Sequence, residues 1–217
     1  MSTPTKKVAF QTLGCKLNFS ETSSISRNFI RHGYEKVNIR EFADIYVVNT
    51  CSVTENANKE TRKLIRRFKR INTNAIIVVT GCYAQLKPDE IMNVDGVNMV
   101  VGTGEKFNLL NHLDSLLLNS EKKLMLKSSI NDVKTFEPSY STNDRTRSFL
   151  KVQDGCNYHC TFCTIPKARG SSRSQTIQQT IQVAKQLAQT GTKEIVLTGV
   201  NIGDFGFGSN ESFYDLI

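Results

Sequence analysis

Three cysteines stand close together in the stretch KVQDGCNYHCTFCTIPKARG, residues 151–170. Cys156, Cys160 and Cys163 form the pattern CxxxCxxC. Ferredoxin-type runs carry a fourth cysteine, and this run lacks it. A cluster held by three thiolates has one iron without a protein ligand, and an open coordination position distinguishes a catalytic metal site from a closed structural one. The spacing therefore indicates a 4Fe–4S cluster that can bind a small molecule.

Other interpretations of this loop are a redox dithiol, half of a zinc site, or cysteines buried in a core. A zinc ribbon needs a second pair of ligands nearby, and the chain has no cysteine or histidine after Cys163. His159 stands inside the loop, but a residue directly before a ligating cysteine rarely points at the same metal. The pattern favours the cluster over zinc.

The other three cysteines are far apart in the chain but share one position. Cys15, Cys51 and Cys82 each follow an apolar, strand-like segment. In parallel sheets the carboxyl ends of neighbouring strands form the crevice in which ligands bind. The alternative is three core cysteines, which would more naturally lie inside the strands. We therefore expect these thiols to share a second metal centre.

Composition limits the class of protein. The 217 residues carry a formal charge of +8, and 39% are hydrophobic. We expect a soluble globular protein in the cytoplasm, because the chain shows neither a signal peptide nor a membrane-spanning apolar run. A reducing compartment favours metal or redox chemistry over disulfides. The positive charge suggests a polyanionic partner.

Apolar runs of strand length alternate with helical patterns along the first half of the chain. We expect strands at residues 6–13, 44–49, 75–80 and 97–102, and helices between them. The expected helices are one that ends at Gly33, one over 54–70 and one over 107–118. This alternation predicts a doubly wound α/β domain with a parallel sheet.

The second half begins a new pattern. We expect an N-terminal α/β domain over 1–125, a polar linker over 126–146, and a further domain over 147–217. Its strand, helix and strand at 149–153, 176–191 and 194–200 form a β-loop-α-β start. A complete (β/α)₈ barrel needs roughly 200 residues or more. We therefore expect only the first part of a barrel.

A basic helix is expected over KETRKLIRRFKR. At helical spacing its cations form two adjacent rows: Lys59, Lys63 and Arg67 in one, and Arg62, Arg66 and Arg70 in the other. Like charges at this spacing cost an isolated helix about 0.2–0.5 kcal/mol per pair. A bound phosphate backbone would explain them, and an ordinary solvated face is the equal alternative. Arg62, Arg66 and Arg70 are thus candidates for RNA binding.

The CxxxCxxC loop after a strand, with Phe162 before its last cysteine, resembles the radical S-adenosylmethionine (radical SAM) superfamily. The resemblance implies that Cys156, Cys160 and Cys163 bind a 4Fe–4S cluster whose free iron chelates S-adenosylmethionine. It implies that the cluster cleaves this cofactor to a 5′-deoxyadenosyl radical. It also places Thr198 and Gly199, in LTGVNIGDFG, beside the cofactor.

The stretches TLGCKLNFSE, VNTCSVTENA, VVTGCYAQLKPDE and IPKARGSSRS together resemble the methylthiotransferase family of radical SAM enzymes. The resemblance implies a second, auxiliary 4Fe–4S cluster on Cys15, Cys51 and Cys82. It implies S-adenosylmethionine and tRNA as partners, with an electron donor and a sulfur source. The branch that it resembles most adds a methylthio group to carbon 2 of threonylcarbamoyl-adenosine beside the tRNA anticodon.

Two alternatives to this function stay open. Other branches of the family act on isopentenyl-adenosine in tRNA or on a ribosomal protein. The other class is a truncated, non-catalytic iron–sulfur or RNA-binding fragment, because family members continue through the rest of the barrel. Release of deoxyadenosine by this chain would separate an enzyme from a binding fragment.

Overall fold

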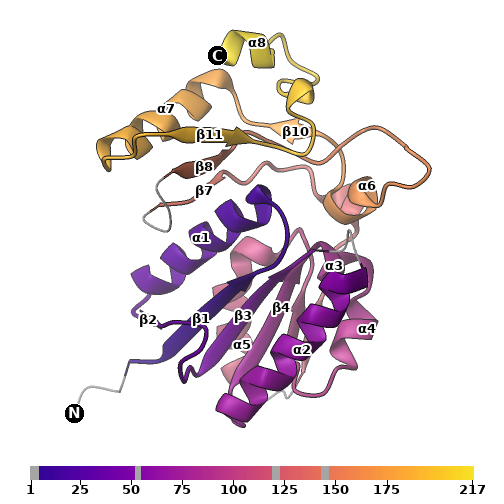
Figure 1. The fold of residues 1–217 in the computed structure, drawn as a ribbon. Coiled ribbons are helices and arrows are strands. Elements are labelled where there is room, and N and C mark those ends of the chain that lie inside the picture. Colours follow the sequence, from indigo (N-terminus) through magenta and orange to yellow (C-terminus); the bar gives the residue numbers. More distant parts are fainter. Residues whose placement is uncertain (1–4, 52–54, 119–122, 143–146) are drawn as a thin grey trace. The chain divides into compact units, whose positions relative to one another are not determined.

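The computed structural model describes residues 5–51, 55–118, 123–142 and 147–217 (Figure 1). Contacts divide the chain into two compact units. Unit 1 comprises Met1–Gly14 and Ile25–Ser128, and unit 2 comprises Cys15–Ser24 and Ser129–Ile217. The first half of helix α1 (Lys16–Arg31) therefore groups with unit 2 and the second half with unit 1.

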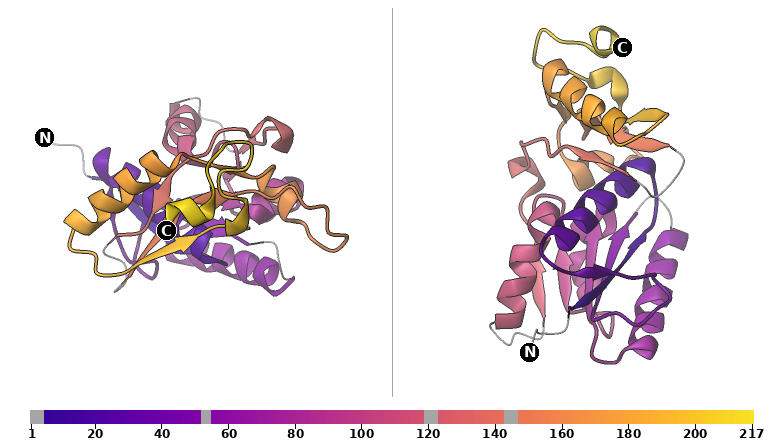
Figure 2. Two further views of the ribbon diagram at one scale, coloured as in Figure 1. Left: turned by 90° about the horizontal axis from the view of Figure 1, so that it is seen from above. Right: turned by 90° about the vertical axis from the view of Figure 1, so that its left-hand side faces the viewer.

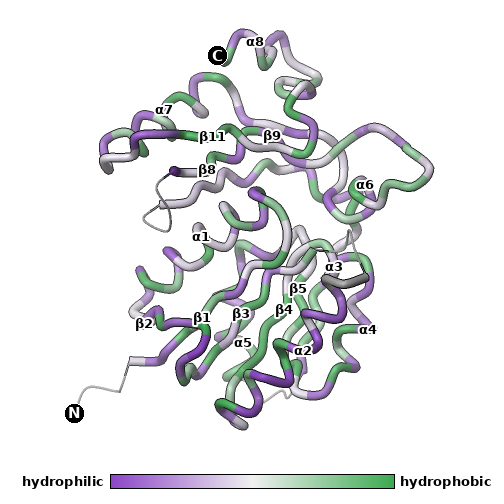
Figure 3. Tube along the Cα trace, viewed as in Figure 1, coloured by the Kyte–Doolittle hydropathy of each residue, from purple (hydrophilic) through white to green (hydrophobic). Residues whose placement is uncertain are grey.

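Unit 1 contains a parallel sheet with strand order β2-β1-β3-β4-β5-β6 in the described residues. Its strands are β1 (Lys7–Thr12), β2 (Glu35–Lys36), β3 (Ile45–Thr50), β4 (Ile76–Gly81), β5 (Met99–Val101) and β6 (Leu124–Leu126). Strands covered on both faces are mostly apolar, and every residue of β3 is buried, its terminal Asn49 and Thr50 included. Figure 3 shows the central strands in the hydrophobic colours. The expected doubly wound parallel sheet is confirmed.

Helices cover both faces of this sheet (Figure 2). On one face, α2 (Glu55–Ile71), α3 (Cys82–Leu86) and α4 (Pro88–Met92) pack on the core that contains Tyr46 and Phe68, whose rings stack. On the other, the second half of α1 and α5 (Leu109–Leu118), which follows the 3₁₀ turn η1 (Lys106–Asn108), pack through Phe29 and Leu113. The expected helices are present, and Thr54 lies outside the described residues.

Unit 2 contains a sheet of order β11-β8-β7. Its strands are β7 (Ser139–Tyr140), β8 (Ser148–Lys151) and β11 (Ile195–Thr198), and a separate antiparallel pair is β9 (Gln153–Asp154) with β10 (Arg173–Ser174). Its helical segments are η2 (Ile130–Asp132), α6 (Ile165–Arg169), α7 (Ile177–Gln189), η3 (Ile202–Asp204) and α8 (Phe213–Leu216). Strands β8 and β11 pair in parallel, so the expected β-loop-α-β start is confirmed.

Two segments of unit 2 differ from the sequence expectation. The strand expected over 149–153 is divided between β8 and β9. The expected linker contains η2 and β7, which pairs antiparallel with β8. Two serines of this segment are buried and hydrogen-bonded: the Ser139 hydroxyl lies 3.1 Å from that of Ser20, and Ser141 Oγ accepts from the Phe149 amide at 2.9 Å. The polar composition of residues 126–146 therefore led to the prediction of a linker where the structure contains strand β7.

No described helix is both long and apolar enough to cross a bilayer.

Candidate metal centres and cofactor site

The cysteine loop, defined as residues 155–164, connects β9 to α6 in unit 2. Cys156 and Cys163 are half-buried and Cys160 is exposed, and all three thiols are free. The Cys163 amide donates to the Cys160 carbonyl at 3.0 Å, which turns this end of the loop back on itself. Three accessible thiols on one short loop are a suitable donor set for an iron–sulfur cluster.

The entry of the cysteine loop is held against the segment that follows α6. At its entry, the Cys156 amide donates to the Gly170 carbonyl at 3.0 Å. The Asn157 side chain accepts from the Ser172 amide at 2.9 Å. Strand β9, just before the loop, pairs with β10, just after α6. The cysteine loop and α6 are therefore closed at a common base formed by residues 153–157 and 170–174, and Cys156 lies in that base.

The base of the loop requires glycine at position 155. Gly155 has φ +74°, and a Cβ there would overlap the Ser171 carbonyl oxygen. Positive φ is strained for other residues, and here the neighbouring atom is backbone that cannot rotate away. The close approach of residue 155 to the backbone of Ser171 therefore depends on this glycine.

We expect Gly155→Ala to lower the free energy of unfolding of unit 2 by more than Gly191→Ala does. Gly191 has φ +85° but no atom within 4 Å of the position that a Cβ would take, so it isolates the cost of the positive φ, about 1 kcal/mol. Thermal or urea unfolding of the two variants provides the comparison. Equal destabilisation would show that the contact with Ser171 imposes no constraint.

A network of buried charges in unit 2 includes Asp154, just before the cysteine loop, and Arg169, at the end of α6. Arg169 Nη1 lies 2.8 Å from Asp154 Oδ1 and 3.1 Å from Glu21 Oε1. Lys151 Nζ lies 3.4 Å from each of the same two carboxylates, and Arg173 Nη2 lies 3.1 Å from Asp154 Oδ2. Glu21, Lys151, Asp154 and Arg169 are at least 98% buried. Charged side chains are tolerated in a buried position only when they are paired. These ion pairs connect α1, β8, β9 and α6.

This network connects the N-terminal cysteine motif with the cysteine loop. Asn18 Oδ1 accepts from Arg169 Nη2 at 2.5 Å and from the Cys15 thiol at 3.8 Å. Asp154 Oδ1 accepts from the Gly155 amide at 2.9 Å. In the sequence, Arg169 stands out only as part of a family stretch. Its partners were not predicted, because they lie 15 to 151 residues away.

Cys51 and Cys82 lie at one edge of the unit 1 sheet. Strands β3 and β4 are neighbours with Thr50 opposite Gly81, and each cysteine follows its strand directly. A Cβ on Gly81 would overlap the Thr50 carbonyl oxygen, so glycine permits the close approach of these strand ends. Cys51 is half-buried and Cys82 buried.

Cys15 follows β1, whose Thr12 lies opposite Asn49 of β3, but the residue itself groups with unit 2. It is exposed. In the described part of the chain, no three His, Cys, Asp or Glu side chains gather closely enough to hold a metal ion. A shared centre on Cys15, Cys51 and Cys82 therefore stays a prediction, as does the cluster on Cys156, Cys160 and Cys163, although thiolates suit both sites chemically.

Thr198 and Gly199 stand at the end of β11. Thr198 is buried and lies opposite Lys151 of β8. A Cβ on Gly199 would lie 2.9 Å from Gln153 Oε1, so the backbone at this position packs directly on a buried amide. The residues that the resemblance assigns to S-adenosylmethionine thus share unit 2 with the cysteine loop.

The basic helix is α2, but its cations are not equivalent. Arg62 forms an ion pair with Glu90, and Tyr83 Oη also donates to Glu90, at 2.8 Å. The hydrogen bond from Tyr83 is the main reason that the pKa of Glu90 is lowered. Arg66 and Arg70 are exposed, and with Lys59, Lys63 and Arg67 they line a groove of about 580 Å³ that also contains Arg62. Arg62 is therefore engaged within the fold, whereas Arg66 and Arg70 face solvent.

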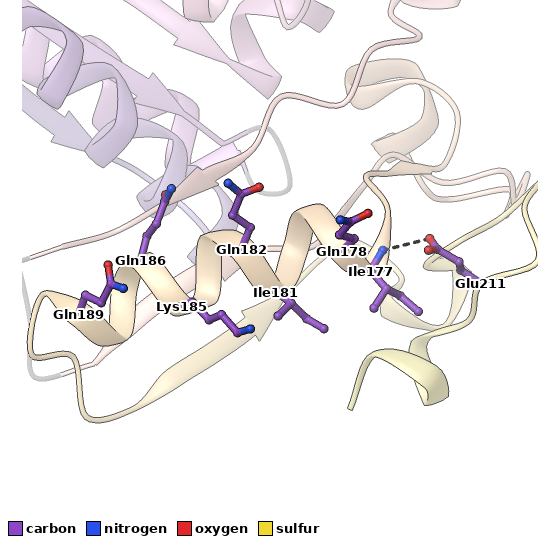
Figure 4. Close-up of a pocket in the computed structure, with 8 residues that line it drawn as sticks. All are labelled: Ile177, Gln178, Ile181, Gln182, Lys185, Gln186, Gln189 and Glu211. Carbon is purple, nitrogen blue, oxygen red and sulfur yellow. Dashed lines mark hydrogen bonds between the residues drawn. The ribbon is translucent and has the colours of Figure 1, made fainter.

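A larger groove, of about 960 Å³, runs along α7 (Figure 4). Glutamines and Lys185 line it, and the Glu211 carboxylate accepts from the Ile177 amide at 3.0 Å at one end. Its lining contains no cysteine and neither Thr198 nor Gly199. Cavity size therefore does not identify the predicted cofactor site.

Family models match both halves of the chain. Residues 7–102 match the model described as "Uncharacterized protein family UPF0004", and residues 150–206 match "Radical SAM superfamily". A solved structure of the radical S-adenosylmethionine methyltransferase TsrM from Kitasatospora setae aligns with a TM-score of 0.61 at 13% identity, over 94% of this chain and 49% of that one. This likeness supports the fold alone.

Curated relatives are tRNA-modifying enzymes. The chain is 42% identical to threonylcarbamoyladenosine tRNA methylthiotransferase MtaB of Aquifex aeolicus, over 97% of this chain and 52% of that protein. It is 45% identical to the protein of the same name from Bacillus subtilis, over 92% and 44% respectively. A tRNA-2-methylthio-N(6)-dimethylallyladenosine synthase from Pelagibacter ubique is 31% identical, over 97% and 48%. The chain thus spans about half the length of the curated relatives it matches.

Proposed function

The chain resembles the radical SAM methylthiotransferases, and we propose that it is the corresponding part of an enzyme that adds a methylthio group to tRNA. The cysteine loop between β9 and α6 is the main support for the proposal. It holds three free thiols, and the pairing of β9 with β10 closes the base of the segment that contains them. The identity to threonylcarbamoyladenosine methylthiotransferases supports the radical SAM class independently.

In this proposal the protein binds two clusters. Cys156, Cys160 and Cys163 hold one, and Cys15, Cys51 and Cys82 hold the other. When bound, the clusters and S-adenosylmethionine supply the one-electron chemistry that activates a carbon–hydrogen bond too weakly acidic for a base. The protein residues position these groups: the base of the cysteine loop orients one set of thiols, and Thr198 and Gly199 border the cofactor. An electron donor and a sulfur source complete the requirements.

The proposed substrate position is carbon 2 of threonylcarbamoyl-modified adenosine beside the anticodon. The relatives that act on threonylcarbamoyladenosine share 36–45% identity with this chain. Those named for dimethylallyladenosine share 31–32%. This difference favours the threonylcarbamoyl branch. Mass spectrometry of tRNA nucleosides from a deletion strain tests it: loss of the methylthio form of one nucleoside identifies the branch.

The activity itself is tested by incubating the anaerobically reconstituted chain with S-adenosylmethionine and a reductant. We expect release of 5′-deoxyadenosine. A preparation that takes up one zinc ion and shows no visible absorption would contradict the proposal. Iron uptake without deoxyadenosine would instead support the binding-fragment alternative.

The proposed tRNA partner predicts a phosphate-binding face on α2. Replacing two exposed arginines, in the double variant Arg66→Glu/Arg70→Glu, should lower tRNA affinity about tenfold or more at low salt. The slope of log K against log salt should fall by about 1.4–1.8, because two phosphate contacts are lost. Filter binding at several salt concentrations measures both quantities.

Lys36→Glu/Arg40→Glu is the matched control, because both residues are exposed in unit 1 and the change in net charge is identical. We expect a smaller loss of affinity for this variant. Equal losses in the two variants would mean that net charge, and not the face of α2, attracts the RNA. The cytoplasmic location stays a prediction from the sequence.

A further inference from the structure

Gln153 is a fully buried residue of β9 whose side-chain amide joins separate segments of unit 2. Its Nε2 donates to the Gly155 carbonyl at 2.7 Å and to Ser172 Oγ at 2.9 Å. Its Oε1 accepts from the backbone amides of Val200 and Asn201, both at 2.9 Å. One carboxamide therefore contacts the entry of the cysteine loop, the chain after α6, and the loop that follows β11.

The chemistry of these contacts specifies glutamine. Two backbone N–H groups require an acceptor on one side, and a carbonyl oxygen requires a donor on the other. A carboxylate supplies only acceptors, and an aliphatic side chain supplies neither. Each group left without its partner in this buried position would cost about 1–3 kcal/mol. The orientation of the amide is also determined, because the reversed orientation would set donors against donors.

The segments that Gln153 joins are those predicted to meet one ligand. Gly155 immediately precedes Cys156, the first thiol of the cysteine loop. Val200 and Asn201 immediately follow Thr198 and Gly199, which border the predicted cofactor. Gly199 packs on Gln153 so closely that a Cβ there would lie 2.9 Å from Oε1 and 3.1 Å from the glutamine Cβ. The side chain thus sets the separation between the cysteine loop and residues 199–201.

We propose that Gln153 is a positioning residue that holds these two loops at the separation at which one bound S-adenosylmethionine contacts both. The ligand named here rests on the proposed function. Gln153 itself does not touch the ligand, and it acts through backbone groups on either side. Its loss therefore affects cofactor affinity more than it affects assembly of a cluster on the three thiols.

Gln153→Glu tests the proposal. The variant keeps an acceptor for Val200 and Asn201 but loses both donors, and it places a carboxylate oxygen against the Gly155 carbonyl. Gln182→Glu is the control, because Gln182 is exposed on α7 and undergoes the same chemical change (Figure 4). Ser172→Ala is a milder variant that removes only one of the acceptors, and its S-adenosylmethionine affinity at unchanged iron content still tests the proposal if Gln153→Glu fails to fold.

The first measurement is amide hydrogen exchange of the metal-free protein. Gln153→Glu should raise exchange about tenfold or more over residues 155–172 and also over 199–204, because the tie between them is broken. Ser172→Ala should raise exchange over 155–172 only, and Gln182→Glu should leave both segments unchanged. Increased exchange confined to one segment in Gln153→Glu would overturn the proposed coupling.

The second measurement is S-adenosylmethionine affinity after anaerobic reconstitution, by equilibrium dialysis. We expect Gln153→Glu to bind about tenfold more weakly at unchanged iron content, and Ser172→Ala about threefold more weakly. A merely structural role would lower iron content and affinity together, and that result would also overturn the inference. If the wild-type chain holds iron but binds no S-adenosylmethionine, the proposed function fails. Amide hydrogen exchange would still show whether Gln153 couples residues 155–172 to residues 199–204.

Discussion

Replacing Cys156 by alanine should abolish S-adenosylmethionine cleavage, whereas replacing Cys51 by alanine should spare cleavage and abolish methylthiolation. The reason is the proposed separation of tasks between two three-cysteine sites in different parts of the fold. The wild-type chain should reconstitute with about eight irons, on the assumption of two four-iron clusters, and each variant should lose about four of them. Deoxyadenosine release measures cleavage, mass spectrometry of tRNA nucleosides measures methylthiolation, and iron analysis measures the loss of a cluster.

The pair of variants is its own control, because each removes one thiol from one proposed cluster. Equal loss of cleavage in both would refute the separation of tasks. An iron content of about four in the wild type, unchanged in Cys51→Ala, would refute the second cluster while leaving the first. The test can therefore refute the auxiliary site on Cys15, Cys51 and Cys82 without refuting the site on the cysteine loop.

Replacing Arg169 by methionine should destabilise unit 2 by about 3–5 kcal/mol. Methionine keeps much of the apolar volume but removes the guanidinium that lies within 3.1 Å of both Glu21 and Asp154. Removing the guanidinium leaves Glu21 with Lys151 and leaves Asp154 with Lys151 and Arg173, so the two buried carboxylates lose their shortest ion pairs without gaining water. Urea unfolding, followed by a probe in unit 2, measures the loss.

Arg147→Met is the matched control, because Arg147 pairs with Glu194 at 3.4 Å with about half of each side chain exposed. Such surface pairs contribute about 0–1 kcal/mol. We expect Arg169→Met to exceed this control by at least about 2 kcal/mol. Similar losses in the two variants would show that the buried network does not stabilise the base of the cysteine loop.

The Arg169 variant also separates stability from chemistry. If Arg169→Met remains folded under the assay conditions, the three thiols of the cysteine loop are still present, so iron uptake should persist. The loop base should nevertheless be looser, because Asp154 Oδ1 also accepts from the Gly155 amide. Hydrogen exchange over residues 155–172 should therefore rise in this variant and not in Arg147→Met.

The fold of unit 1 was predictable from local pattern. Continuous apolar segments such as 75–80 are typical of strands covered on both faces, and the parallel sheet has them at its centre. The positions of Cys51 and Cys82 after neighbouring strands followed from the same pattern, because parallel strands end at one edge. The strand at 139–140 was not predictable, because Ser139 is polar and is buried only through partners elsewhere in the chain.

The sequence alone predicts the chemistry of this protein, from three closely spaced cysteines, three more after strand-like segments, and a set of motifs that resembles one family. Spacing along the chain carries that information, because thiols a few residues apart on one loop can reach a common ligand. Only the tertiary structure decided which residues support the cysteine loop. Gln153, Glu21 and Arg169 make contacts over separations of up to 151 residues, and no local pattern records such contacts. Hydrogen bonds and buried charges find their partners only after the chain has folded.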